Sequence, residues 1–185
     1  PRLASSSNQL LAVVFDSTNL APSEFETWLS TGDGKDPNVE IKPADTALLI
    51  YTSGTTGVPK GVQLLHRSLS FMRLCEHLEP AYDWQDHDVM LTVMPVFHLV
   101  GTGLSVQALY NGAAVSLLPA PAPAPLLQVL ARDRPTICAL VPTAIQMVLD
   151  HPDATGADFS SLRLVMYACS AISSALLQRA LREMK

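Results

Sequence analysis

The sequence predicts an α/β fold, in which a parallel sheet built from βαβ layers carries helices on both faces. Short, continuously apolar runs of the kind that form buried strands recur along the chain. Segments with the apolar spacing of amphipathic helices separate these runs, and strands joined by helices pair in parallel. Because ligands bind beyond the carboxyl ends of such strands, we expect the site in the loops that follow them. The predicted strands span residues 47–51, 89–93, 113–118, 137–141 and 162–167.

The first part of the chain is less regular. Residues 1–44 are polar and rich in loop-forming residues, and we expect them to form a lead-in segment of the same domain. Within it, an apolar run at 10–15 predicts a strand and a cluster of Gly, Asp and Pro at 30–37 predicts a turn. Regular alternation begins at Asp45, so residues 45–185 form the predicted α/β subdomain.

The predicted helices follow from apolar spacing and from start signals. Apolar residues line one side of a helix that begins at His66. Pro125 suits the first turn of a helix after the extended Pro/Ala run at 119–125, and Ser173 suits the N-cap of the last helix. The predicted helices span residues 66–78, 101–110, 125–132, 143–149 and 173–184.

Composition narrows the function classes. The 185 residues suit one domain, and 48% hydrophobic with 16% charged residues is typical of a globular chain. The formal net charge is -5, with 12 Lys and Arg against 17 Asp and Glu and no basic run, which argues against a nucleic-acid partner. No apolar stretch reaches the roughly 18 residues of a transmembrane helix, so no membrane span is expected.

The cysteines and the chain ends carry two further expectations. The 3 cysteines are far apart and form no C-x-x-C pair, which favours reduced, mostly buried thiols in a cytoplasmic protein. The chain begins without Met and without a signal sequence, and it ends within a helical pattern. We therefore expect it to be a fragment of a larger protein.

A loop rich in glycine and hydroxyl side chains follows the first predicted strand, in the sequence YTSGTTGVPKGV at residues 51–62. Glycines let backbone N–H groups approach an oxyanion and tolerate positive φ, while Ser and Thr hydroxyls donate further hydrogen bonds. Lys60 adds a compact positive charge, so the loop suits a polyphosphate. It is not a Walker A loop, because Pro59 precedes Lys60 and Gly61 follows it. The pattern therefore disfavours a P-loop kinase.

This loop resembles the phosphate-binding signature of the adenylate-forming superfamily, which comprises acyl-CoA synthetases, nonribosomal peptide adenylation domains and beetle luciferases. Later features follow in that superfamily's order: His66 at a helix start, MPVFHLVG at 94–101, which resembles P-x-F-H-x-x-G, and ACSAIS at 168–173, which resembles G-G-A-P-L-S. The resemblance covers residues 45–185 and is greatest to fatty acyl-CoA ligases. It implies that the parallel α/β fold is part of the superfamily's large N-terminal domain.

The resemblance implies a two-step reaction that uses ATP, Mg²⁺ and CoA. A small-molecule carboxylic acid would attack the α-phosphorus of ATP to give an acyl-AMP and pyrophosphate, and the CoA thiol would then displace AMP. The implied phosphate contacts are Thr52, Ser53, Gly54, Thr55, Thr56, Gly57 and Lys60. The implied substrate contacts are His98, Val100, Gly101, Ala168, Cys169 and Ser170.

His98 indicates which acid is activated. In the amino-acid-activating branch an Asp commonly occupies this position and pairs with the α-ammonium of the substrate, so His98 favours an acid without an α-amino group. A fatty acid is our first expectation, because Val100, Leu104 and Met166 supply apolar side chains that suit an aliphatic chain. His98 is also the candidate for a catalytic role within these residues.

The segment at 168–170 departs from the superfamily pattern. Ala168 and Cys169 occupy the places of paired glycines that lie near adenine in the superfamily. A nucleophilic role for Cys169 is disfavoured, because no His lies nearby in the sequence.

Two other functions remain possible for this sequence. An acyl-AMP ligase that loads a carrier protein and a non-catalytic nucleotide-binding relative both fit the motifs. The superfamily's Mg²⁺-holding Glu, its ribose-binding Asp and its catalytic Lys are not among residues 1–185, so no metal ligands are expected here and we expect these residues alone to be inactive. Self-association could cover a free edge of the sheet, and a homo-oligomer is therefore also open.

Overall fold

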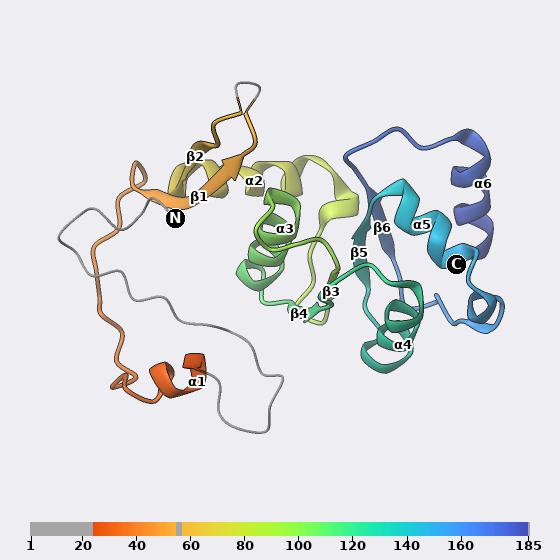
Figure 1. Cartoon of the computed structure of the whole chain (residues 1–185), viewed down its shortest axis with the longest axis horizontal. Helices are drawn as coiled ribbons and strands as arrows, with labels where there is room; N and C mark the ends of the chain where they lie inside the picture. The colour runs from red at the N-terminus through yellow and green to blue at the C-terminus, as the bar shows by residue number, and fades with distance from the viewer. Residues whose placement is uncertain (1–23, 55–56, 185) are drawn as a thin grey trace. The chain divides into compact units, whose positions relative to one another are not determined.

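The computed structural model describes residues 24–54 and 57–184 (Figure 1). The chain divides into two compact units, with the boundary between Ile41 and Lys42. The described part of the first unit contains one short helix, α1 (Glu24–Leu29), followed by a turn at the start of the predicted 30–37 turn cluster. Helix α1 was not predicted, since its six residues are too few to show helical periodicity. The strand predicted at 10–15 lies outside the described residues.

The second unit contains the predicted parallel sheet. Its four strands run in the order β4-β3-β5-β6, and every neighbouring pair is parallel. The predicted fold class, a parallel sheet with helices around it, is therefore confirmed. The strands are β3 (Val89–Thr92), β4 (Ala114–Leu117), β5 (Ile137–Leu140) and β6 (Leu164–Tyr167). The helices that follow them are α3 (Leu99–Tyr110), α4 (Pro123–Asp133), α5 (Pro142–Leu149) and α6 (Ser174–Glu183).

Alternate residues of the central strands enter two separate cores, one on each face of the sheet. Leu91 of β3 packs in a core built with residues of α4 and α5 and with Met184, which follows α6. Its neighbour Met90 packs in a second core with Ala108 of α3. The same alternation holds in β5, where Cys138 enters the first core and Ala139 the second. This period of two is that of a strand covered on both faces, so helices do lie on both sides of the sheet (Figure 1).

Local signals set the starts of these helices. Ser173 caps α6, because its hydroxyl oxygen accepts a hydrogen bond from the backbone N–H of Leu176 at 3.2 Å. Helix α4 begins at Pro123, two residues before the start expected at Pro125, and α5 begins at Pro142. Proline suits a first turn because its fixed φ is helical and its missing N–H has no partner there. Two short 3₁₀ helices also occur, Pro80–Tyr82 and Pro152–Gly156.

The first strand of the second unit contradicts our prediction. Strand β1 (Thr46–Thr52) does not belong to the parallel sheet, and it pairs antiparallel with β2 (Lys60–Leu65) as a separate two-stranded hairpin. Nor is β1 buried throughout, since Leu49 is 48% exposed and Tyr51 61% exposed. Strand β2 was not predicted, and it shortens the loop expected at 52–61. A short connection favours antiparallel pairing, because a parallel crossover needs about a dozen residues or more.

Helix α2 (His66–Leu78) starts directly after β2, at the residue predicted from the sequence. It contacts both strands of the hairpin as well as α3, so it connects the hairpin to the parallel sheet. None of the helices in the described part of the chain is long and apolar enough to cross a membrane.

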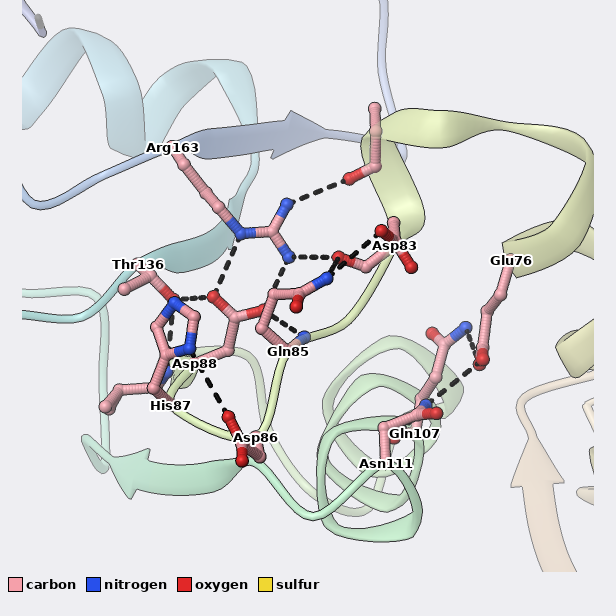
Figure 2. Close-up of polar contacts among 12 residues, drawn as sticks. Glu76, Asp83, Gln85, Asp86, His87, Asp88, Gln107, Asn111, Thr136 and Arg163 are labelled. Atoms are coloured by element: carbon pink, nitrogen blue, oxygen red, sulfur yellow. Dashed lines mark hydrogen bonds and ion pairs between the residues drawn. The ribbon is translucent and has the colours of Figure 1, made fainter.

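A cluster of hydrogen-bonded polar side chains lies at the amino-terminal edge of the parallel sheet (Figure 2). Asp88 directly precedes β3, Thr136 directly precedes β5, and Arg163 directly precedes β6. The Asp88 carboxylate accepts hydrogen bonds from both of the other side chains. This cluster ties three strands together at the edge opposite to their carboxyl ends.

Candidate functional site

The loop predicted to hold phosphates forms the turn of the β1–β2 hairpin. Thr52 pairs with Lys60 at its base, and the Gly57 N–H donates to the Gly54 carbonyl at 3.4 Å. Gly54 has φ 56° and Gly57 has φ 77°, both in the left-handed region that favours glycine. A Cβ on Gly54 would also lie 2.6 Å from the carbonyl oxygen of Val58. The backbone of the turn therefore requires glycine at position 54 on two grounds.

Polar side chains of this turn are open to solvent. Thr52, Ser53 and Lys60 are exposed, while Thr55 and Thr56 lie outside the described residues. The Lys60 Cγ lies 3.6 Å from where a Cβ on Gly54 would be, so the aliphatic stem of Lys60 runs beside the bare glycine backbone. Hydroxyl donors, an ammonium group and a glycine turn at one place suit a polyphosphate anion.

The loop that carries His98 leaves the carboxyl end of β3. His98 is the N-cap of α3, and its Nδ1 accepts a hydrogen bond from the Val100 N–H at 3.3 Å. A neutral imidazole that accepts at Nδ1 carries its proton on Nε2. The exposed ring therefore has a donor nitrogen to offer to a ligand. This capping role was not predicted, because Ser, Thr, Asp and Asn are the usual N-cap signals and His is not among them.

Gly101 lies where no side chain fits. A Cβ on this residue would lie 2.4 Å from the carbonyl oxygens of both Met94 and Pro95. The first turn of α3 therefore packs directly against the backbone of the preceding loop. The Ser105 hydroxyl donates to the Gly101 carbonyl at 2.7 Å, which leaves Thr92 to donate to Ser105 across their 2.8 Å contact. This chain of bonds links the end of β3 to the first turn of α3.

Val100, predicted to contact substrate, is turned toward the sheet. Its half-buried side chain packs in the second core together with Leu104 and Met166. The apolar side chains that we expected to line an acyl pocket thus cover one face of the sheet.

The third predicted segment follows β6. Ala168, Cys169 and Ser170 are all exposed. Cys169 has φ 72°, the conformation that glycine adopts readily and other residues rarely adopt. Of the two residues that stand in the place of the superfamily's paired glycines, Cys169 therefore adopts a glycine-like backbone and Ala168 does not. Cys169 is exposed, contrary to the expectation of mostly buried thiols. Cys138 is buried as expected, and burial raises the pKa of its thiol to about 12.

The sheet brings two of the three predicted segments to one edge. Strands β3 and β6 are parallel and both flank β5, so the His98 loop and the 168–170 loop leave the same carboxyl edge. The hairpin turn is not part of this edge. In the described chain no hydrogen bond or ion pair joins residues 52–54 or 57–60 to His98 or to 168–170.

Two features bear on other ligands. Over residues 24–54 and 57–184 there is no cluster of three or more His, Cys, Asp or Glu side chains that could hold a metal ion. A cavity of about 300 Å³ lies between β1, α2 and α3, and His66, singled out in the sequence at the start of α2, is one of its lining residues.

Comparisons with known proteins give concordant results. The profile of the AMP-binding enzyme family matches residues 3–185. The chain is 33% identical over 160 residues to the fatty acid–[acyl-carrier-protein] ligase ScoC of Streptomyces coeruleorubidus, a match that covers 85% of this chain and 31% of that protein. It is 35% identical over 154 residues to 4-coumarate–CoA ligase 3 of Arabidopsis thaliana, which covers 80% of this chain and 28% of that protein. The chain therefore spans less than a third of the length of these two relatives.

A solved structure supports the same fold. The N-terminal domain of FACL13 from Mycobacterium tuberculosis superposes with a TM-score of 0.76 at 23% identity, over 88% of this chain and 40% of that chain. At this identity the likeness concerns the fold alone.

Proposed function

Because the chain belongs to the AMP-binding enzyme family, we propose that the intact protein uses ATP to activate a carboxylic acid. In the first step a carboxylate oxygen bonds to the α-phosphorus, the α–β anhydride bond breaks, and pyrophosphate leaves. In the second step a thiol sulfur bonds to the acyl carbon, the thiol proton is lost, and AMP leaves with the former carboxylate oxygen. The names of the two relatives, both acid ligases, support this reaction class.

The hairpin turn is the observation that carries the proposal. We assign the β- and γ-phosphates of ATP to the turn that contains Gly54 and Gly57, together with the Ser53 hydroxyl and the Lys60 ammonium. These groups would neutralise the charge that develops as pyrophosphate departs. Thr52, Thr55 and Thr56 complete the proposed contacts.

We assign the acid to the carboxyl edge of the parallel sheet. The Nε2–H of His98 is a donor suited to a carboxylate oxygen, and the cap at Nδ1 holds the ring in that tautomer. Gly101 keeps the loop tight against α3 and so fixes the position of His98. Ala168, Cys169 and Ser170, which leave the same edge, are the proposed neighbours of the adenosine half.

We also propose which class of carboxylic acid is activated. His98 stands in place of an ammonium-binding Asp, so we propose an acid without an α-amino group, and a fatty acid before others. The likeness to ScoC supports a fatty acid, while the likeness to 4-coumarate–CoA ligase 3 favours an aromatic propenoic acid as the second candidate. The acceptor of the acyl group also has two candidates. We propose CoA, and an acyl carrier protein is the alternative. Free thiols at Cys138 and Cys169 fit a cytoplasmic location.

The test uses the intact protein with a panel of fatty, aromatic and amino acids, and scores AMP release with CoA or carrier protein as acceptor. Lys60→Gln is expected to lower kcat/KM for ATP by at least about tenfold while the unfolding midpoint stays unchanged, because Lys60 is exposed. Lys42→Gln, an exposed lysine outside the turn, is the matched control. Acid-dependent AMP release that Lys60→Gln and Gly54→Ala leave intact would refute the assignment of the turn, and nucleotide binding without AMP release would support a non-catalytic relative instead.

A further inference from the structure

The α2–α3 cavity, the space of about 300 Å³ between β1, α2 and α3, is separate from both parts of the proposed site. On α3 it is lined by residues from Gly103 to Tyr110, toward the end of the helix away from His98. Its volume is about twice that of a 150 Å³ engineered apolar cavity that binds benzene. It is therefore large enough for a small organic molecule.

The walls of the cavity are mainly apolar. Leu69 and Met72 of α2 face Val106 of α3 across it. Gly103 contributes no side chain, and a Cβ there would come within ordinary contact of Met72, at 3.7 Å from its Cε. The absence of a side chain at position 103 keeps this part of the cavity open. The body of a ligand in the cavity would thus be apolar.

Among the residues that line the cavity, Glu76 carries a negative group, and Figure 2 shows its hydrogen bonds to Gln107 and Asn111. The Glu76 carboxylate lines the cavity and accepts one hydrogen bond at each oxygen, from Gln107 Nε2 at 2.8 Å and from Asn111 Nδ2 at 3.1 Å. Gln107 is only 6% exposed. A carboxylate has about four acceptor positions, so these two bonds orient Glu76 and leave it able to accept from a ligand.

We propose that the α2–α3 cavity is a binding site for a small molecule with an apolar body and an ammonium or hydroxyl group at one end. The donor end would bond to Glu76 and the body would lie between Leu69, Met72 and Val106. The negative charge of Glu76 disfavours a carboxylate at this place. The ligand therefore differs in chemistry from the proposed acid substrate, and its binding does not depend on acid activation.

The test is titration calorimetry of the intact protein, without ATP, against octylamine, octanol and octanoate. These probes share one apolar body and differ only in the polar end. We expect octylamine to bind most tightly, octanol less tightly, and octanoate at least about tenfold more weakly than octylamine, because a hydrogen bond to a charged group contributes most. Glu76→Gln is expected to remove the preference for octylamine over octanol and to leave octanol binding within about twofold.

A second pair of variants locates the site. Gly103→Leu is expected to fill the cavity and weaken binding of octylamine and octanol by at least about tenfold. The matched control is Gly156→Leu, since a Cβ at this glycine meets nothing within 4 Å and the residue lies outside the cavity. If Gly103→Leu fails to fold, Val106→Phe fills the same space from an exposed position. Octanoate binding as tightly as octylamine, or binding that neither Glu76→Gln nor the filling variants alter, would overturn the proposal.

Discussion

The guanidinium of Arg163 donates to both carboxylate oxygens of Asp88, at 2.9 Å from Nε to Oδ1 and 2.5 Å from Nη2 to Oδ2, across 75 residues of sequence. Asp88 is fully buried, and it also accepts from the Thr136 hydroxyl at 2.6 Å and from the Gln85 N–H at 2.9 Å. Arg163 in turn donates to the backbone carbonyls of Ala81 and Asp83. The buried carboxylate is thus fully hydrogen-bonded, which is the condition under which a buried charge is tolerated.

Asp88→Asn should destabilise the fold without touching the proposed site. The change leaves the partly exposed Arg163 guanidinium without its anion and weakens its charged hydrogen bonds, which should cost about 2 kcal/mol. The measurement is the free energy of unfolding in urea. Asp86→Asn, which alters an exposed carboxylate beside His87, is the control and should change stability by less than about 0.5 kcal/mol. Equal effects of the two changes would show that the Asp88 cluster does not stabilise the sheet.

The same cluster predicts how stability depends on pH. Burial alone would raise the pKa of the Asp88 carboxyl, but hydrogen bonds from Arg163, Thr136 and the Gln85 N–H outweigh burial and hold the pKa well below its ordinary value. A lowered pKa stabilises the folded state above the unfolded value of about 3.9, and this contribution is lost as pH falls through the folded value. The difference in unfolding free energy between wild type and Asp88→Asn should therefore be constant from about pH 5 to 7 and shrink below about pH 4. A difference that grows on acidification would contradict this assignment.

The sequence allowed the centre of the parallel sheet to be predicted because β3 and β5 are buried on both faces. Residues 137–141 are apolar at every position, and β5 is buried at all of its residues. The same reasoning misplaced β1, because a short apolar run does not reveal which strand it will pair with. The Asp88–Arg163 pair could not be predicted either, since contacts between residues so far apart follow from strand order rather than from any local pattern.

Two neighbouring glycines of α3 should respond oppositely to alanine. Gly101→Ala would place a Cβ 2.4 Å from two backbone carbonyl oxygens, so the loop must move or the helix must shift. We expect a loss of about 2–4 kcal/mol in unfolding free energy. Gly103→Ala meets only ordinary contacts and should gain up to about 1 kcal/mol from helix propensity. Thermal unfolding measures both, and a Gly101→Ala protein as stable as Gly103→Ala would show that the close approach does not exist.

Cys169 offers a test of backbone strain at the carboxyl edge. Cys169 has φ 72°, and a β-branched side chain tolerates this left-handed region poorly. Cys169→Val should therefore lower the free energy of unfolding by about 1–2 kcal/mol. In Cys169→Gly the relief of strain and the greater freedom of the unfolded chain oppose each other, so the net change should stay within about 0.5 kcal/mol. Chemical unfolding of both variants compares them directly. A valine variant as stable as the glycine variant would place Cys169 in an ordinary conformation.

The proposed site could be predicted in its composition but not in its arrangement. The glycine and hydroxyl pattern at 52–60 identified the turn, and the hairpin now explains why glycine is needed at 54 and 57. The cap formed by His98 and the clash that excludes a side chain at Gly101 depend on how α3 packs against its preceding loop. Glu76 and Gln107 meet only because α2 packs on α3, so no local sequence pattern predicts their contact in the α2–α3 cavity.

The most direct test of the proposed reaction follows one oxygen atom. The intact protein is given ATP, a thiol acceptor and an acid whose carboxylate is enriched in heavy oxygen, and the nucleotide products are analysed by mass spectrometry. Attack of the carboxylate on the α-phosphorus predicts AMP that carries one heavy oxygen, together with unlabelled pyrophosphate. Heavy oxygen in inorganic phosphate, with ADP as the nucleotide product, would contradict the account.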